Sequence, residues 1–198
     1  RNNFNGNFLP GFEDIKLKNS ANGAGLVHID HVVGNQPDGV MQPVCDFYEK
    51  VFDWHRFWSV DDNDLSTKYS SLRSIVMAND NEKIKMPINE PAKGLKKSQI
   101  QEFVDYYNGA GIQHVAMSTK DIIKTVEKLR SNGVEFLPTP QSYYDTLLDR
   151  VGDLKEDIDL LSNMGILVDF DENGYMLQIF TKPIQDRPTL FYEIIQRK

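Results

Sequence analysis

The sequence predicts an α+β fold in which two tandem β-α-β-β-β modules form an open barrel. One observation is that the same order of strand-like and helix-like patterns occurs twice along the chain. A second is that the two opening strands can be aligned, "IDHVV" against "IQHVA". A third is that His114 follows His31 by nearly the same interval by which Glu193 follows His114. A repeat of this length is typical of a duplicated module rather than of a solenoid.

The first module is expected at about residues 26–92. The run "LVHIDHVV" predicts a strand, and the loop "GNQPDGVMQP" follows it. Pro43 suits the start of a helix, and "VCDFYEKVF" places Val44, Phe47, Tyr48 and Val51 on one helical face. Three further runs predict strands: "WHRFWSV", "YSSLRSIVMA" and "KIKMPIN".

The second module is expected at about residues 110–198. The strand "GIQHVAMST" is followed by Ser118 or Thr119 as a helix cap, and the helix runs from about Asp121 to near Gly133. Next come a short strand, "VEFL", and two inserted helical stretches, 142–150 and 154–164. The run "GILVDFDENGYMLQIFTK" predicts a hairpin, and a strand that contains Glu193 closes the module. The predicted buried side of the helix consists of Ile122, Ile123, Val126 and Leu129.

Composition and charge narrow the class of protein. The chain has 198 residues, of which 40% are hydrophobic, and a net charge of −7. This acidity argues against nucleic acid or an anionic membrane as a partner. No apolar run approaches the roughly 20 residues that span a bilayer. The single cysteine, Cys45, fits a reducing compartment, so a cytoplasmic protein is expected. Residues 1–25 are rich in Asn and Gly and predict a linker or an extended lead-in.

The repeat also predicts a metal site. In each opening strand the histidine, His31 or His114, shares a face with apolar neighbours, so two modules packed about a pseudo-twofold axis would bring the histidines together. Glu193 lies between Phe191 and Ile195 on one face of the closing strand, where a buried carboxylate requires a cation or strong donors. Two imidazoles and one carboxylate form the facial triad that suits non-haem Fe(II). The alternative is a pair of hydrogen-bonded core histidines and a solvated glutamate.

These residues carry a resemblance that spans nearly the whole chain. The duplicated unit resembles the vicinal-oxygen-chelate (glyoxalase-like) fold, and the ordered motifs resemble the 4-hydroxyphenylpyruvate dioxygenase family, in its C-terminal catalytic domain. The motifs include "IDHVVGNQPD", "YSSLRSIVMAN", "KMPINEP", "GAGIQHVAM", "GILVDFDENGYMLQIFTKP" and "DRPTLFYEIIQR". The resemblance assigns the metal ligands to His31, His114 and Glu193, and the metal to Fe(II). It assigns substrate-binding roles to Ser74, Asn89, Gln99, Gln113, Gln178, Phe180 and Phe191.

The resemblance also implies an activity. It is the conversion of 4-hydroxyphenylpyruvate and O2 to homogentisate and CO2, a step of tyrosine and phenylalanine catabolism, by oxidative decarboxylation, ring hydroxylation and side-chain migration. No acid–base residue is assigned beyond the metal ligands. A homo-oligomer, dimer or tetramer, is expected. Family members have two double-module domains, so residues 1–25 would be a lead-in from an N-terminal domain that is missing here, and a closing segment after residue 198 would be missing as well.

Two alternatives stay open. Hydroxymandelate synthase uses the same substrate and metal site but hydroxylates the benzylic carbon. A fragment of this fold that binds a ligand without catalysis is the other.

Overall fold

The computed structural model describes residues 11–13, 23–60, 72–92, 97–147, 154–171 and 174–198. Most of the predicted lead-in, residues 1–10 and 14–22, lies outside the described residues. The strands are β1 (Leu26–Asn35), β2 (His55–Val60), β3 (Leu72–Ala78), β4 (Lys85–Pro91), β5 (Gly111–Thr119), β6 (Leu167–Asp171), β7 (Gly174–Phe180) and β8 (Phe191–Arg197). The helices are α1 (Met41–Phe52), α2 (Gln99–Tyr107), α3 (Ile122–Ser131), α4 (Gln141–Asp145) and α6 (Ile158–Met164).

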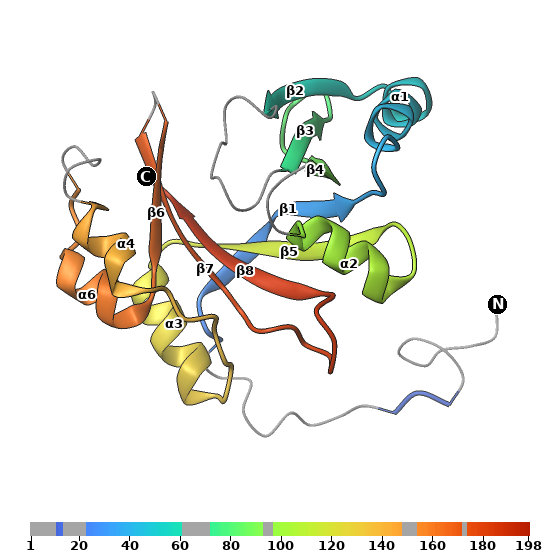
Figure 1. The fold of residues 1–198 in the computed structure, drawn as a ribbon. Coiled ribbons are helices and arrows are strands. Elements are labelled where there is room, and N and C mark those ends of the chain that lie inside the picture. The colour runs from blue at the N-terminus through green and yellow to red at the C-terminus, as the bar shows by residue number, and fades with distance from the viewer. Residues whose placement is uncertain (1–10, 14–22, 61–71, 93–96, 148–153, 172–173) are drawn as a thin grey trace.

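The strands form one eight-stranded sheet with the order β2-β3-β4-β1-β5-β8-β7-β6. In the first half β1 pairs in parallel with β4, and in the second half β5 pairs in parallel with β8. The two opening strands, β1 and β5, pair with each other in the antiparallel direction at the centre of the sheet. The prediction of two tandem β-α-β-β-β modules is therefore confirmed. The sheet is strongly curled (Figure 1).

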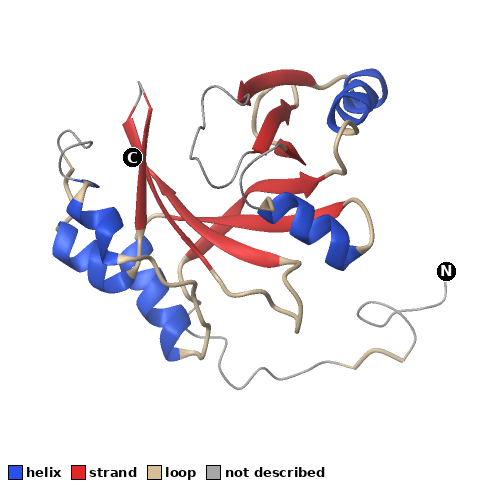
Figure 2. Ribbon diagram, in the orientation of Figure 1, coloured by secondary structure: helices blue, strands red, loops and turns tan. Residues whose placement is uncertain are grey.

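The helices cover the sheet on the face that carries its apolar cores. Helix α1 lies beside the first half, while α3, α4 and α6 lie together against the second half (Figure 2). Because side chains alternate along a strand, polar residues next to these core positions point to the opposite face. Among the described residues, no helix is long and apolar enough to cross a membrane.

The buried side of α1 differs in part from the prediction. Val44 and Tyr48 pack against the core as expected, but Phe47 and Val51 are 52% and 56% exposed. The side of the helix that faces the sheet is instead centred on Met41 and Cys45, one turn apart. The buried core here consists of Met41, Cys45, Ile75, Met77 and Ile88.

The second module corrects two local predictions. The cap of α3 is Asp121 itself, whose side chain accepts a hydrogen bond from the backbone N–H of Lys124, because Ser118 and Thr119 still belong to strand β5. The run "VEFL" does not form a strand; Phe136 makes only an isolated bridge to Thr181. Helices α4 and α6 lie at the two predicted inserted stretches. Helix α6 begins at Ile158, four residues later than predicted. The end of the first stretch, from residue 148, lies outside the described residues.

Helix α2 was not predicted, although the sequence carries a signal for it. Ser98 is the N-cap and accepts from the backbone N–H of Ile100, and Gln101 stands three residues after the cap. This spacing matches a capping box. Asn108 ends the helix in the left-handed conformation, and Ile100, Phe103 and Val104 are buried.

Candidate metal centre

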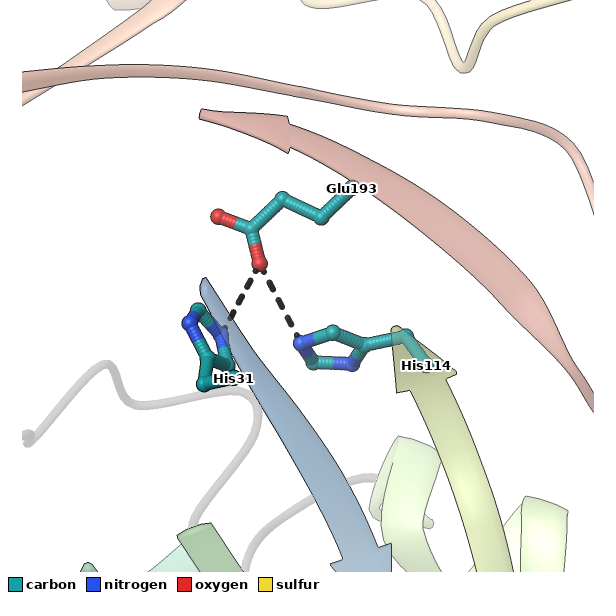
Figure 3. A group of neighbouring side chains, drawn as sticks. All are labelled: His31, His114 and Glu193. Atoms are coloured by element: carbon teal, nitrogen blue, oxygen red, sulfur yellow. Dashed lines mark ion pairs between the residues drawn. The ribbon is translucent and has the colours of Figure 1, made fainter. Parts of the chain in front are cut away.

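Three adjacent strands bring His31, His114 and Glu193 together. They lie on β1, β5 and β8, and Figure 3 shows their side chains pointing toward one point. Oε2 of Glu193 is 3.2 Å from Nε2 of His31 and 3.3 Å from Nε2 of His114. One ligand atom from each residue lies within 4.8 Å of the others. The three side chains can therefore share one metal ion.

Strand register explains why the three side chains meet. Ala116 on β5 is the pairing partner of His31 on one side and of Glu193 on the other. Ala116 is fully buried. Its methyl group leaves space above the middle strand, so the longer side chains from both neighbouring strands can extend over it.

The site is buried and charged. Glu193 is only 2% exposed. Burial by itself would raise the pKa of Glu193, but the hydrogen bonds and positive charge of the two histidines hold it below its usual value. Burial likewise lowers the pKa of His31, yet its hydrogen bonds to Asp30 and Glu193 dominate and raise that pKa to about 9. Without a metal, a protonated imidazole therefore balances the buried carboxylate.

Each histidine is also held at its second ring nitrogen. Nδ1 of His31 lies 2.8 Å from Oδ1 of Asp30, and Nδ1 of His114 lies 3.1 Å from Oε1 of Gln113. Gln113 was expected only as a substrate contact. The contact between Asp30 and His31 was not predicted. The sequence does carry a signal for it, because a polar residue precedes the histidine in both "IDHVV" and "IQHVA".

Two of the expected substrate residues border the site as aromatic walls. Phe191 stacks on the His114 ring, with centroids 4.9 Å apart, and Phe180 meets the same ring edge-on at 6.1 Å. Phe180 also pairs in register with Glu193. A cavity of about 280 Å³ adjoins Phe180 and is lined mainly by apolar side chains, among them Leu137 and Leu167.

Gln178 lies on the same face of β7 as Phe180. Its amide nitrogen donates a 2.6 Å hydrogen bond to Oδ2 of Asp169 on strand β6. Since a primary amide has one oxygen and two N–H groups, this bond leaves the amide oxygen and one N–H for another partner.

Ser74 and Asn89 occupy the other half of the sheet. They are register partners on β3 and β4, both are buried, and both point away from helix α1. The Asn89 amide nitrogen reaches the Asn35 side-chain oxygen at 3.5 Å. Gln99, by contrast, is exposed on the first turn of α2, and its assignment to the pocket stays a prediction.

The two remaining histidines have no part in this cluster. His28 is exposed, and its Nδ1 lies 3.0 Å from the Ser118 hydroxyl. His55 lies 3.7 Å from the carboxylate of Glu82 at the surface.

Comparison with known proteins gives strong similarity over the whole chain. The chain is 56% identical over 206 aligned residues to 4-hydroxyphenylpyruvate dioxygenase of Tetrahymena thermophila, covering 100% of this chain and 51% of that protein. It is 53% identical over 205 residues to the enzyme of that name from Dictyostelium discoideum, covering 100% of this chain and 56% of the relative. The chain thus spans about half the length of the curated relatives it matches.

Among solved structures, a triple mutant of 4-hydroxymandelate synthase from Streptomyces coelicolor superposes with a TM-score of 0.73 and 34% identity, over 86% of this chain and 48% of that one. The family model of the Glyoxalase/Bleomycin resistance protein/Dioxygenase superfamily matches residues 28–179, which contain both histidines of the cluster. This match extends over more than half of the sequence, and the chain belongs to that superfamily.

Proposed function

We propose that the chain is the catalytic part of an Fe(II)-dependent dioxygenase that converts 4-hydroxyphenylpyruvate and O2 to homogentisate and CO2. The observation that carries the proposal is the convergence of His31, His114 and Glu193 at one point. The names of the relatives that are 53–56% identical support the choice of substrate.

The donor set fits ferrous iron. His31, His114 and Glu193 would hold the ion through two imidazole nitrogens and one carboxylate oxygen, the donor set typical of non-haem Fe(II) oxygenases. Metal binding requires His31 to give up its proton, which removes the positive charge that balances Glu193 in the metal-free protein. The bound cation would then compensate the buried Glu193 carboxylate in its place. Fe(II) held there would supply the activation of O2 for decarboxylation of the keto acid and hydroxylation of the ring.

The chain itself would bind and orient the substrate. Phe180 and Phe191 form an apolar corner at right angles, with ring centroids 5.9 Å apart, beside His114. Such a corner can hold an aromatic ring edge-on and keep water from the metal. The free oxygen and N–H of Gln178 can hydrogen-bond a phenol or a carboxylate.

Ser74 and Asn89 would provide polar contacts from the first half of the sheet. Both are buried, and groups of this kind are costly to leave without partners. Gln99 would join them only if the ligand reaches the exposed start of α2. The acidic charge argues against nucleic acid as a further partner. We further propose a cytoplasmic protein that assembles as a homodimer or homotetramer.

Product identification tests this function. The chain is incubated with Fe(II), ascorbate, 4-hydroxyphenylpyruvate and air, and the products are separated by chromatography. Homogentisate is expected. 4-Hydroxymandelate would instead favour the synthase activity named for the solved structure of similar fold. Substrate binding without any product would indicate a binding module.

A further inference from the structure

Both imidazole rings of the cluster are held at both nitrogens. Their Nε2 atoms face Glu193 at 3.2 and 3.3 Å, and their Nδ1 atoms face a side-chain oxygen of the preceding residue. That residue is Asp30 for His31 and Gln113 for His114. The duplicated module therefore repeats the acceptor together with the histidine.

These contacts determine which ring nitrogen can bind a metal. An ionised carboxylate and an amide oxygen accept hydrogen bonds and cannot donate them. Nδ1 must therefore carry the hydrogen in both rings, and the lone pair of a neutral ring then lies on Nε2. Acceptors of this kind orient metal-binding histidines and raise their basicity.

The two acceptors differ in charge and in the side chains that hold them in place. Asp30 is anionic and mostly buried, and Arg197 holds it with two hydrogen bonds, Nε to Oδ2 at 3.0 Å and Nη2 to Oδ1 at 2.7 Å. Arg197 lies on β8, the strand that also carries Glu193, so a single strand positions a cluster member and anchors an acceptor. Gln113 is buried and neutral.

We propose that Asp30 and Gln113 are positioning residues, which fix Nδ1–H on the following histidine and present both Nε2 atoms to one metal ion. The anionic acceptor makes His31 the stronger of the two imidazole donors. This inference rests on the metal site of the proposed function, but it concerns residues that do not touch the metal.

Co(II) titration of the substrate-free chain tests the proposal. Asp30→Leu removes the acceptor and is expected to weaken Co(II) binding roughly 10- to 100-fold. Asp30→Asn removes the same charge but keeps an oxygen that can accept from Nδ1, and it is expected to bind Co(II) more tightly than Asp30→Leu. Gln113→Leu changes no charge and is expected to weaken binding roughly 10-fold.

The comparison of the two Asp30 variants separates acceptor from charge. If only the long-range charge mattered, Asp30→Asn and Asp30→Leu would bind Co(II) equally, and Gln113→Leu would match the wild type. Either result overturns the proposal. Asp186→Asn removes an exposed carboxylate and serves as the control, with unchanged affinity expected. Wild-type chain that binds no Co(II) would overturn the proposed metal site as well, whereas normal binding by all variants overturns only this inference.

A second measurement remains informative if a leucine variant does not fold. Nitrogen-15 NMR of the imidazoles in the Zn(II)-loaded wild-type chain is expected to show hydrogen on Nδ1 and metal on Nε2 for both His31 and His114. Zinc on Nδ1 of either ring would contradict the proposal.

Discussion

Oε2 of Glu193 lies 3.2 Å from Nε2 of His31, although the two residues stand near opposite ends of the described chain. Strand pairing through Ala116 creates this proximity, and it joins the first module to the second at a single point. In the metal-free protein, the buried Glu193 carboxylate and the partly buried His31 imidazole depend on each other for charge compensation.

Removal of the carboxylate should abolish tight metal binding. Glu193→Ala leaves two imidazoles without the anionic donor, so Fe(II) content after anaerobic loading and desalting is expected to fall to background. Glu135→Gln, which removes a surface carboxylate from an ion pair with Lys182, is the matched control and should keep its iron. Normal iron content in Glu193→Ala would refute the triad.

The metal-free protein should lose stability as the pH rises through the range in which His31 titrates. The pKa of His31 is raised from 6.5 to about 9, so the folded state binds the proton more tightly than the unfolded state. The stabilisation is complete below pH 6.5 and disappears as the pH approaches 9, with a slope of at most about 1.4 kcal/mol per pH unit. Urea unfolding of the metal-free chain across this range measures it.

The same experiment on His31→Gln provides the comparison. This variant lacks the titrating imidazole, so its free energy of unfolding should change less between pH 6.5 and 9 than that of the wild type. Parallel pH profiles for the two chains would show that His31 is not protonated in the folded metal-free state.

Enlargement of Ala116 should separate the members of the cluster. Ala116 is fully buried between His31 and Glu193, so Ala116→Leu is expected to cost about 1–3 kcal/mol of stability and also to weaken Co(II) binding. Ala78→Leu, at a fully buried alanine of strand β3, should cost similar stability without affecting Co(II) affinity. Equal Co(II) affinity in the two variants would argue against the role of Ala116 as a spacer.

Loss of the Phe180 ring should weaken substrate binding without loss of metal. Phe180→Ala removes the edge-on wall next to His114, and the apparent Kd for 4-hydroxyphenylpyruvate is expected to rise roughly 10-fold, or about 1.4 kcal/mol. Phe170→Ala removes a 40% exposed ring that contacts Tyr175 on β7 and serves as the control. Unchanged binding and product ratio in Phe180→Ala would assign Phe180 to the core alone.

The sequence predicts the parts of this fold that repeat or alternate. The matching positions of His31 and His114 predict their convergence if the two modules pack about a pseudo-twofold axis that passes between the opening strands. Glu193 is found by a different signal, which is a charged residue in an apolar strand. Both signals concern residues inside strands, so they hold even where the ends of the helices are predicted wrongly.

Local details were less predictable because several residues compete for each role. Ser118, Thr119 and Asp121 can all cap a helix, and only the extent of strand β5 decides in favour of Asp121. The buried side of α1 depends on how the helix sits over Ile75 and Ile88, which no periodicity reveals. The hydrogen bond that Asp30 accepts from His31 depends on side-chain orientation next to Arg197, a residue far along the chain.

The proposed function requires that His31, His114 and Glu193 together hold ferrous iron where a keto acid can reach it. The most direct test is to add Fe(II) and 4-hydroxyphenylpyruvate to the chain without oxygen and to record the visible spectrum, with Glu193→Ala in parallel. A charge-transfer band of the iron–keto acid complex is expected in the wild type and none in the variant. A wild type that shows no band at saturating Fe(II) and substrate, or a variant that shows the same band, would contradict the proposed function.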